Sequence, residues 1–164
     1  MASDVIAAVA TPTGRGGVAV IRLSGPNLRP LLGALTKIEV LPRRATVAKF
    51  RAADDATIDQ GLALFFPAPQ SYTGEDVVEL QLHGGSASLS LVFDELHRLG
   101  IRPALPGEFS FRAVRNGKMS LDQAQAVSDL IAASNRDAVG LALEKMSGSQ
   151  NRLVREFGEE IRTL

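Results

Sequence analysis

The sequence contains no cysteine and no tryptophan, and its 164 residues include one tyrosine and two histidines. The lack of cysteine excludes disulfides, thiolate nucleophiles and cysteine-based zinc sites. With only two histidines and no cysteine, we expect no metal site. The elbow motif G-x-S-x-G of serine hydrolases is also missing. These absences remove the common nucleophile and zinc chemistries and direct attention to binding functions.

The chain carries no excess of charge of either sign, because 18 Lys and Arg residues balance 18 Asp and Glu residues. This balance argues against a protein whose main function is to bind a nucleic acid backbone, although a local patch of basic residues is compatible with it. No apolar run approaches the roughly 20 residues of a membrane span. At the N-terminus, Asp4 stands where a signal peptide would have a basic residue. We therefore expect a cytoplasmic globular protein without a membrane anchor.

The pattern of apolar residues predicts an α+β fold. The expected strands are Val5–Ala10, Gly17–Leu23, Arg44–Ala52, Gln60–Phe66, Asp76–His83 and Ile101–Ala104, and the expected helices of this part are Asn27–Thr36 and Ser86–Leu99. After Pro106-Gly107 only helical patterns follow. We place a small mixed-sheet domain at residues 1–117 and the beginning of a helical domain at residues 118–164.

Two signals predict where the later helices begin. Ser120 with Gln123 forms a possible capping box, and Ser134 is the expected cap of a longer helix beginning near Asn135. Apolar residues of that helix form a stripe at steps of three and four up to Leu164, and no glycine, proline or basic turn closes it. We infer a fragment of a longer polypeptide or a helix completed by a partner.

The glycine-rich stretch TPTGRGGVAVIRLSGP, residues 11–26, raises the question of a phosphate-binding loop. In the dinucleotide-binding fingerprint such glycines connect a strand to a helix, whereas here they lead into a predicted strand. No Lys-Ser or Lys-Thr pair follows them, as a P-loop would require. The stretch is therefore interpreted as a tight turn.

Two charges lie in strands that otherwise have the pattern of buried segments. Arg22 shares a predicted strand face with Val18 and Val20, and Glu79 shares one with Val77. A buried guanidinium or carboxylate is costly unless it is paired. Two interpretations follow: the side chains bind each other or backbone groups, or they hold a polar ligand together with Lys118. Periodicity does not separate these alternatives.

Three stretches together resemble one protein family: TPTGRGGVAVIRLSGP, GLALFFPAPQSYTGEDVVELQLHGG and PGEFSFRAVRNGKMSLDQAQAVSDLIAAS. They are similar to the N-terminal part of the tRNA modification GTPases of the MnmE family, also called TrmE. The match covers nearly the whole chain in the same order. The combination of SYTGEDVVEL, HGG, PGEF and NGK is highly specific.

The resemblance implies an N-terminal α+β domain that dimerises and binds a 5-formyltetrahydrofolate-type one-carbon donor. It also implies a helical domain with an inserted GTP-binding domain, for which the full-length protein uses GTP, potassium and magnesium. With the flavin-dependent partner MnmG, also called GidA, family members modify the wobble uridine of certain tRNAs. Carried over by motif, the folate-contacting residues are Arg22, Glu79 and Lys118.

The sequence departs from the family pattern in ways that limit what the chain does. Leu82 stands where the family usually has a glycine before HGG, and a bulky side chain there can narrow the pocket or shift the dimer contact. No Walker-type loop, N-K-x-D motif or cysteine-containing tail is present, so GTP hydrolysis and the complete tRNA chemistry do not reside in this chain. The alternatives are a free-standing folate-dependent one-carbon transferase and a truncated remnant that only dimerises.

Overall fold

The computed structural model describes residues 4–12, 14 and 16–147 of the chain. Within them, six strands form one sheet: β1 (Ile6–Val9), β2 (Gly16–Gly25), β3 (Thr46–Arg51), β4 (Thr57–Phe66), β5 (Asp76–Gly84) and β6 (Arg102–Pro103). The helices of the same residues are α1 (Leu28–Thr36), α2 (Ser86–Arg98), α3 (Glu108–Arg115), α4 (Leu121–Ala132) and α5 (Arg136–Met146). The chain divides into two compact units, Met1–Phe109 and Ser110–Leu164. Together these elements make an α+β fold, as predicted.

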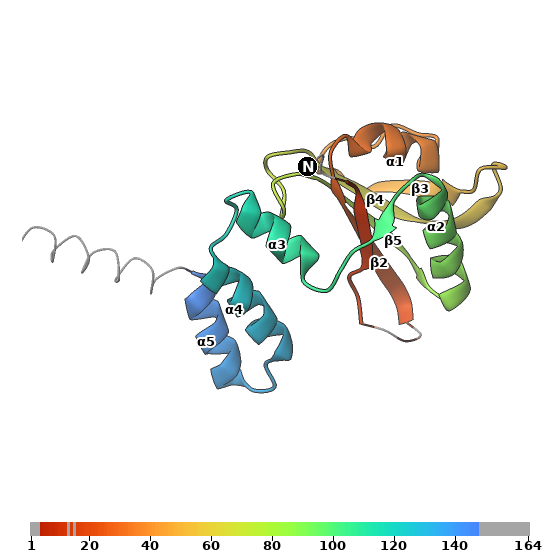
Figure 1. Ribbon diagram of the computed structural model, residues 1–164. Helices are drawn as coiled ribbons and strands as arrows, with labels where there is room; N and C mark the ends of the chain where they lie inside the picture. Colours follow the sequence, from red (N-terminus) through yellow and green to blue (C-terminus); the bar gives the residue numbers. More distant parts are fainter. Residues whose placement is uncertain (1–3, 13, 15, 148–164) are drawn as a thin grey trace, which may run out of the picture. The chain divides into compact units, whose positions relative to one another are not determined.

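The sheet of the first unit has the strand order β3-β4-β5-β2-β1-β6 (Figure 1). Neighbouring strands are antiparallel, apart from β1 and β6, which run parallel. In the pair at the centre, β2 and β5, the register runs from Ala19 opposite Leu82 to Gly25 opposite Asp76. Because successive side chains of a strand point to opposite faces, this register decides which residues of the two strands meet.

The hydrophobic core lies on one face of the sheet, under α1 and α2. Alternate residues of the central strands point into it: Ile21 and Leu23 from β2, Val78, Leu80 and Leu82 from β5, and Ala63 and Phe65 from β4. The helices contribute Leu28, Leu32 and Leu35 from α1 and Val92 and Leu96 from α2. The residues between these strand positions define what we call the second face: Val18, Val20, Arg22, Leu62, Leu64, Glu79, Gln81 and His83. The polar side chains of Arg22, Glu79, Gln81 and His83 thereby lie on the second face.

The second unit contains a pair of packed helices, α4 and α5. The predicted capping box is confirmed, because the Ser120 side chain accepts from the Gln123 N–H and the Gln123 side chain accepts from the Ser120 N–H. The cap predicted for the next helix is wrong by one residue. Asn135, and not Ser134, accepts the N–H of Ala138 at 2.9 Å.

The remaining sequence predictions for the fold are largely confirmed. Each expected strand and helix of the first unit is present, with β2 extending to Gly25 and β4 beginning earlier, at Thr57. The apolar stripe predicted towards Leu164 lies partly outside the described residues. The predicted division of the chain at residues 117 and 118 stays a prediction, and α3 begins before that position.

Candidate functional site

Arg22 and Glu79 lie directly opposite each other on β2 and β5, in the middle of the second face. The Arg22 Nη2 and Nε atoms donate to Glu79 Oε1 at 2.8 Å and 3.0 Å. The side chains are 31% and 20% exposed, so the pair is half-buried and open to one side. The pairing of the two charges, one of the alternatives left open by the sequence, is thus present in this structure.

The pair nevertheless leaves hydrogen-bonding capacity unused. Both Arg22 donors bind Oε1, and within the described part of the chain nothing donates to Glu79 Oε2. No side-chain polar atom buried in that part lacks a partner, so Oε2 is in contact with solvent. A carboxylate oxygen in this position can accept an N–H from a ligand without prior displacement of the arginine.

Tyr72 adds an aromatic ring to the site. The Arg22 guanidinium carbon lies 5.4 Å from the centroid of the Tyr72 ring, within the range of cation–π attraction. Tyr72 belongs to the SYTGED segment between β4 and β5, where the Gly74 N–H donates to the Ser71 hydroxyl at 3.0 Å. The ring therefore comes from a structured turn. Sequence reasoning missed this residue, although it is the only tyrosine of the sequence.

The turn that carries Tyr72 is tied to β2 by buried hydroxyl groups. Ser24 Oγ lies 2.7 Å from Thr73 Oγ1 and donates to Glu75 Oε2 at 2.9 Å. Both Ser24 and Thr73 are fully buried. Two residues after Arg22 along β2, the strand is thus bonded to the turn, which holds the ring and the guanidinium in one arrangement.

Lys118, the third predicted residue, belongs to the second unit. The Lys118 N–H donates to the Ala113 carbonyl at 2.8 Å, and the Gly117 N–H donates to the Val114 carbonyl at 3.0 Å. Together with the left-handed φ of 69° at Gly117, these bonds form the Schellman ending of α3. The exposed Lys118 follows this helix end. Its participation in one site with Arg22 and Glu79 stays a prediction.

Leu82 does not face the site. Its side chain is buried and belongs to the core on the helix-covered face, while Glu79 points to the second face. The two positions are three residues apart along β5, and an odd offset puts side chains on opposite faces. The bulky residue at this position therefore does not narrow the space at Arg22 and Glu79.

His83 has a partner that the sequence did not reveal. Its Nδ1 atom lies 2.7 Å from Asp59 Oδ1, and its backbone N–H donates to Asp59 Oδ2 at 3.0 Å. The Asp59 side chain is 8% exposed and the histidine 73%. Burial acts to raise the pKa of Asp59, but hydrogen bonds from the His83 ring and from the Gln60 and His83 backbone outweigh it and lower the pKa. Asp59 thus remains ionised and fixes the histidine at the end of β5.

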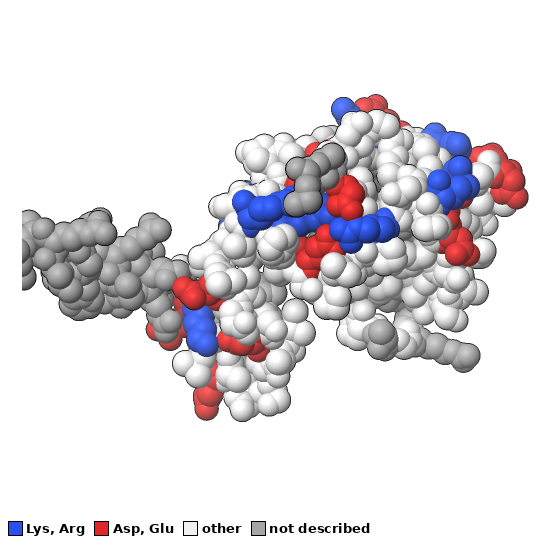
Figure 2. All heavy atoms as spheres, viewed as in Figure 1, with Lys and Arg blue, Asp and Glu red and all other residues white. Residues whose placement is uncertain are grey.

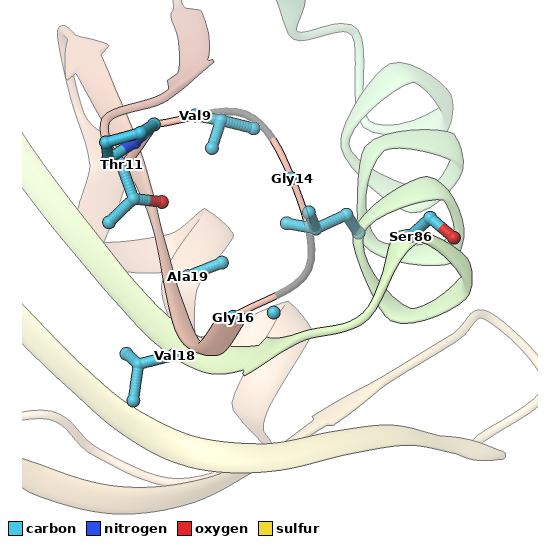
Figure 3. Close-up of a pocket in the computed structure, with 10 residues that line it drawn as sticks. Val9, Thr11, Gly14, Gly16, Val18, Ala19 and Ser86 are labelled. Carbon is cyan, nitrogen blue, oxygen red and sulfur yellow. The ribbon is translucent and has the colours of Figure 1, made fainter.

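The glycine-rich stretch lines a hollow of about 590 Å³ together with the start of α2. Figure 3 shows Val9, Thr11, Gly14 and Gly16 around this opening, with Ser86 of α2 across from them. The segment connects two antiparallel strands, β1 and β2, and not a strand to a helix. The geometry therefore differs from that of a dinucleotide-binding loop, and the interpretation as a tight turn stays a prediction.

Among the described residues, no group of three or more His, Asp or Glu side chains is arranged to hold a metal ion. In the same part of the chain, every helix is too short or too polar to cross a membrane. Of the three predicted site residues, the structure brings Arg22 and Glu79 together on the second face, with Tyr72 beside Arg22.

Comparison with known proteins shows the family to which this chain belongs. The family model described as GTP-binding protein TrmE N-terminus matches residues 5–118. That range includes both strands of the site, the tyrosine turn and Lys118.

Curated relatives give the same result over more of the chain. The tRNA modification GTPase MnmE of Dechloromonas aromatica is 52% identical over 161 residues, which are 98% of this chain and 36% of the relative. The proteins of the same description from Alkalilimnicola ehrlichii and Neisseria meningitidis are each 51% identical, over 96% and 97% of this chain and 35% and 36% of their own length. The chain belongs to the MnmE (TrmE) family of tRNA modification GTPases. It spans about a third of the length of these relatives and corresponds to their N-terminal part.

Proposed function

We propose that this chain is the folate-binding and dimerisation module of an MnmE-type protein. The bound group would be a reduced folate such as 5-formyltetrahydrofolate, which supplies a one-carbon unit when present. Its role would be to position this donor for modification of the tRNA wobble uridine in the cytoplasm, together with the MnmG partner. GTP hydrolysis would belong to a part of the full-length protein outside this chain.

The observation that carries the proposal is the half-buried Arg22–Glu79 pair with its solvent-facing oxygen. A pterin ring presents an N–H and an amino group side by side, and one carboxylate can accept both. Glu79 has one oxygen available for this contact, while Arg22 carries a positive charge for an anionic end of the same ligand. Tyr72 supplies an aromatic face beside them. In this proposal Lys118 contributes a second cation.

Apolar residues around the site support self-association. Val18, on β2, is 63% exposed. It lines one shallow hollow together with Leu62 of β4, which is half-buried. Exposed apolar side chains gathered on one surface mark a contact with another protein. Analytical ultracentrifugation should show a dimer at micromolar concentration, and a monomer at all concentrations would exclude dimerisation through this unit.

Isothermal titration calorimetry with 5-formyltetrahydrofolate tests the binding proposal. Glu79→Gln keeps the shape and an acceptor for Arg22 but removes the charge. Because a hydrogen bond to a charged group contributes about 1.5–3 kcal/mol, the dissociation constant should rise roughly 10- to 100-fold. Glu39→Gln is the matched control, since Glu39 forms an exposed pair with Arg29 at 3.0 Å away from the second face.

The possible outcomes separate the parts of the proposal. If the wild-type protein gives no heat and no thermal shift, it does not bind folate. If Glu79→Gln binds like the wild type, the residue assignment is wrong while folate binding stands. A free-standing one-carbon transferase would in addition convert the folate, which chromatography of the incubated ligand would detect.

A further inference from the structure

Basic residues are unevenly distributed along this chain of zero net charge. Residues 40–53 contain four of them and no acidic residue: Arg43, Arg44, Lys49 and Arg51. This segment includes β3, which is the outermost strand at one end of the sheet. A lysine on an edge strand is a common protection against edge-to-edge pairing. Four basic residues without an acidic residue in the segment are more than this protection of an edge strand requires.

Three cations from two elements surround one hollow at this edge. The hollow has a volume of about 360 Å³ and is lined by Lys37, Lys49 and Arg51, with uncharged side chains between them. Lys49 and Arg51 are two residues apart on one side of β3, a separation of about 6.6 Å along the strand. Lys37 follows α1 and has a left-handed φ of 57°, which ends the helix there. Helix end and strand thus converge on one basic concavity.

Two acidic residues near this hollow, Asp55 and Glu95, already form ion pairs. Arg51 pairs with Asp55 at 3.3 Å, so its charge is partly neutralised. Glu95 is bound by Arg98 at 2.5 Å. The hydrogen bond from Arg98 is the main cause that lowers the pKa of Glu95, and the charge of Lys37 adds to it. Figure 2 shows basic and acidic side chains side by side over this end of the unit.

Lys37 and Lys49 differ from these paired charges. Both are exposed, and neither forms an ion pair within the described residues. The residue across the strand from Lys49 is Gln60, which carries no charge. Two exposed ammonium groups without an ion-pair partner among the described residues therefore give this edge a local positive potential that the whole chain lacks.

We propose that this surface, the basic edge formed by Lys37, Lys49 and Arg51, binds the phosphate backbone of RNA. The inference rests on the proposed function, in which the substrate is a tRNA. Cations repeated along an extended strand suit a ligand whose negative charges also repeat, and such contacts require no base recognition. The basic edge positions the RNA and does not read its sequence.

Fluorescence anisotropy with a labelled tRNA transcript, measured over a series of salt concentrations, tests this inference. Each lost phosphate contact should reduce the slope of log affinity against log salt by about one. We expect a reduction of about one for Lys49→Gln and about two for Lys37→Gln with Lys49→Gln. Lys49→Arg should restore the wild-type slope. Arg136→Gln, which removes an exposed charge at the start of α5, should leave it unchanged.

Three results would overturn the inference. The first is a wild-type protein that does not bind the tRNA. The second is an unchanged slope and affinity in the double variant. The third is competition by poly-glutamate as effective as that of unlabelled tRNA at equal charge, since it would indicate an acidic protein as the partner. Folate calorimetry on the same variants keeps the tests separate, because loss of RNA binding with intact folate binding concerns only the basic edge.

Discussion

Replacement of Gly61 by alanine should destabilise the sheet strongly, because no space exists for a Cβ atom there. Gly61 lies on β4, and a Cβ added to it would stand 1.8 Å from the Gln81 carbonyl oxygen of β5. Ordinary contact begins at 3.4 Å, so the two backbones would have to separate by about 1.6 Å. Since the contact is with backbone and not with a flexible side chain, rotation cannot relieve it.

The expected loss of stability follows from what this separation breaks. One or two ladder hydrogen bonds between β4 and β5 would be lost, each contributing about 0.5–1.5 kcal/mol. Displacement of packed core residues on β5 adds about 1–3 kcal/mol. A total near 3 kcal/mol lowers the Tm by about 12–24 °C for a unit of this size.

Thermal unfolding followed by circular dichroism is the appropriate assay, because the chain has no tryptophan. Gly17→Ala is the matched control. Gly17 also lies in a strand of the sheet, and a Cβ atom there meets nothing within 4 Å. The control should change the Tm by no more than about 4 °C, as a surface substitution does. A Tm change of no more than about 4 °C for Gly61→Ala would refute the reasoning.

Three further substitutions, one of them a control, test local interactions of the two units. Ser120→Ala should lower the stability of α4 by about 0.5–2 kcal/mol, because the capping box is lost. Ser134→Ala is the control: it removes a hydroxyl next to the actual cap at Asn135 and should leave the circular dichroism melting curve unchanged. His83→Ala should lower the free energy of unfolding, measured in urea near neutral pH. The pKa of Asp59 is lowered in the folded protein, so the difference in unfolding free energy between wild type and variant should shrink as the pH falls from about 5 to about 2. A difference that does not depend on pH would contradict this prediction.

The sequence predicted the parts of the structure that depend on local pattern. Alternation along β5 correctly placed Glu79 on one face and Val78 and Leu80 on the other. The capping box of α4 was also predictable, because its two members are three residues apart. Asn135 was missed because it follows Ser134 directly, and both residue types cap helices well.

Contacts between distant segments were beyond a single sequence. The Arg22–Glu79 pair depends on the register of β2 against β5, and 57 residues separate its members. Asp59 reaches His83 only because β4 and β5 are neighbours, and the two are 24 residues apart. Tyr72 lies over Arg22 because buried hydroxyls tie its turn to β2, an interaction without a periodic signature.

The Arg22–Glu79 pair sets a condition on any ligand of this site. A ligand with two parallel donors would use both oxygens of Glu79, whereas Arg22 occupies Oε1 in this structure. Binding of such a ligand to both oxygens of Glu79 would therefore weaken the hydrogen bond between Glu79 and Arg22. That loss would offset part of the favourable binding free energy of the ligand. The guanidinium so released would still lie beside Tyr72, with donors available to a negative group. A ligand carrying both a donor pair and an anion would replace the internal pair at both ends, while a neutral heterocycle would leave the arginine without a partner. If the proposed folate site is correct, it would therefore favour an anionic pterin over a neutral one.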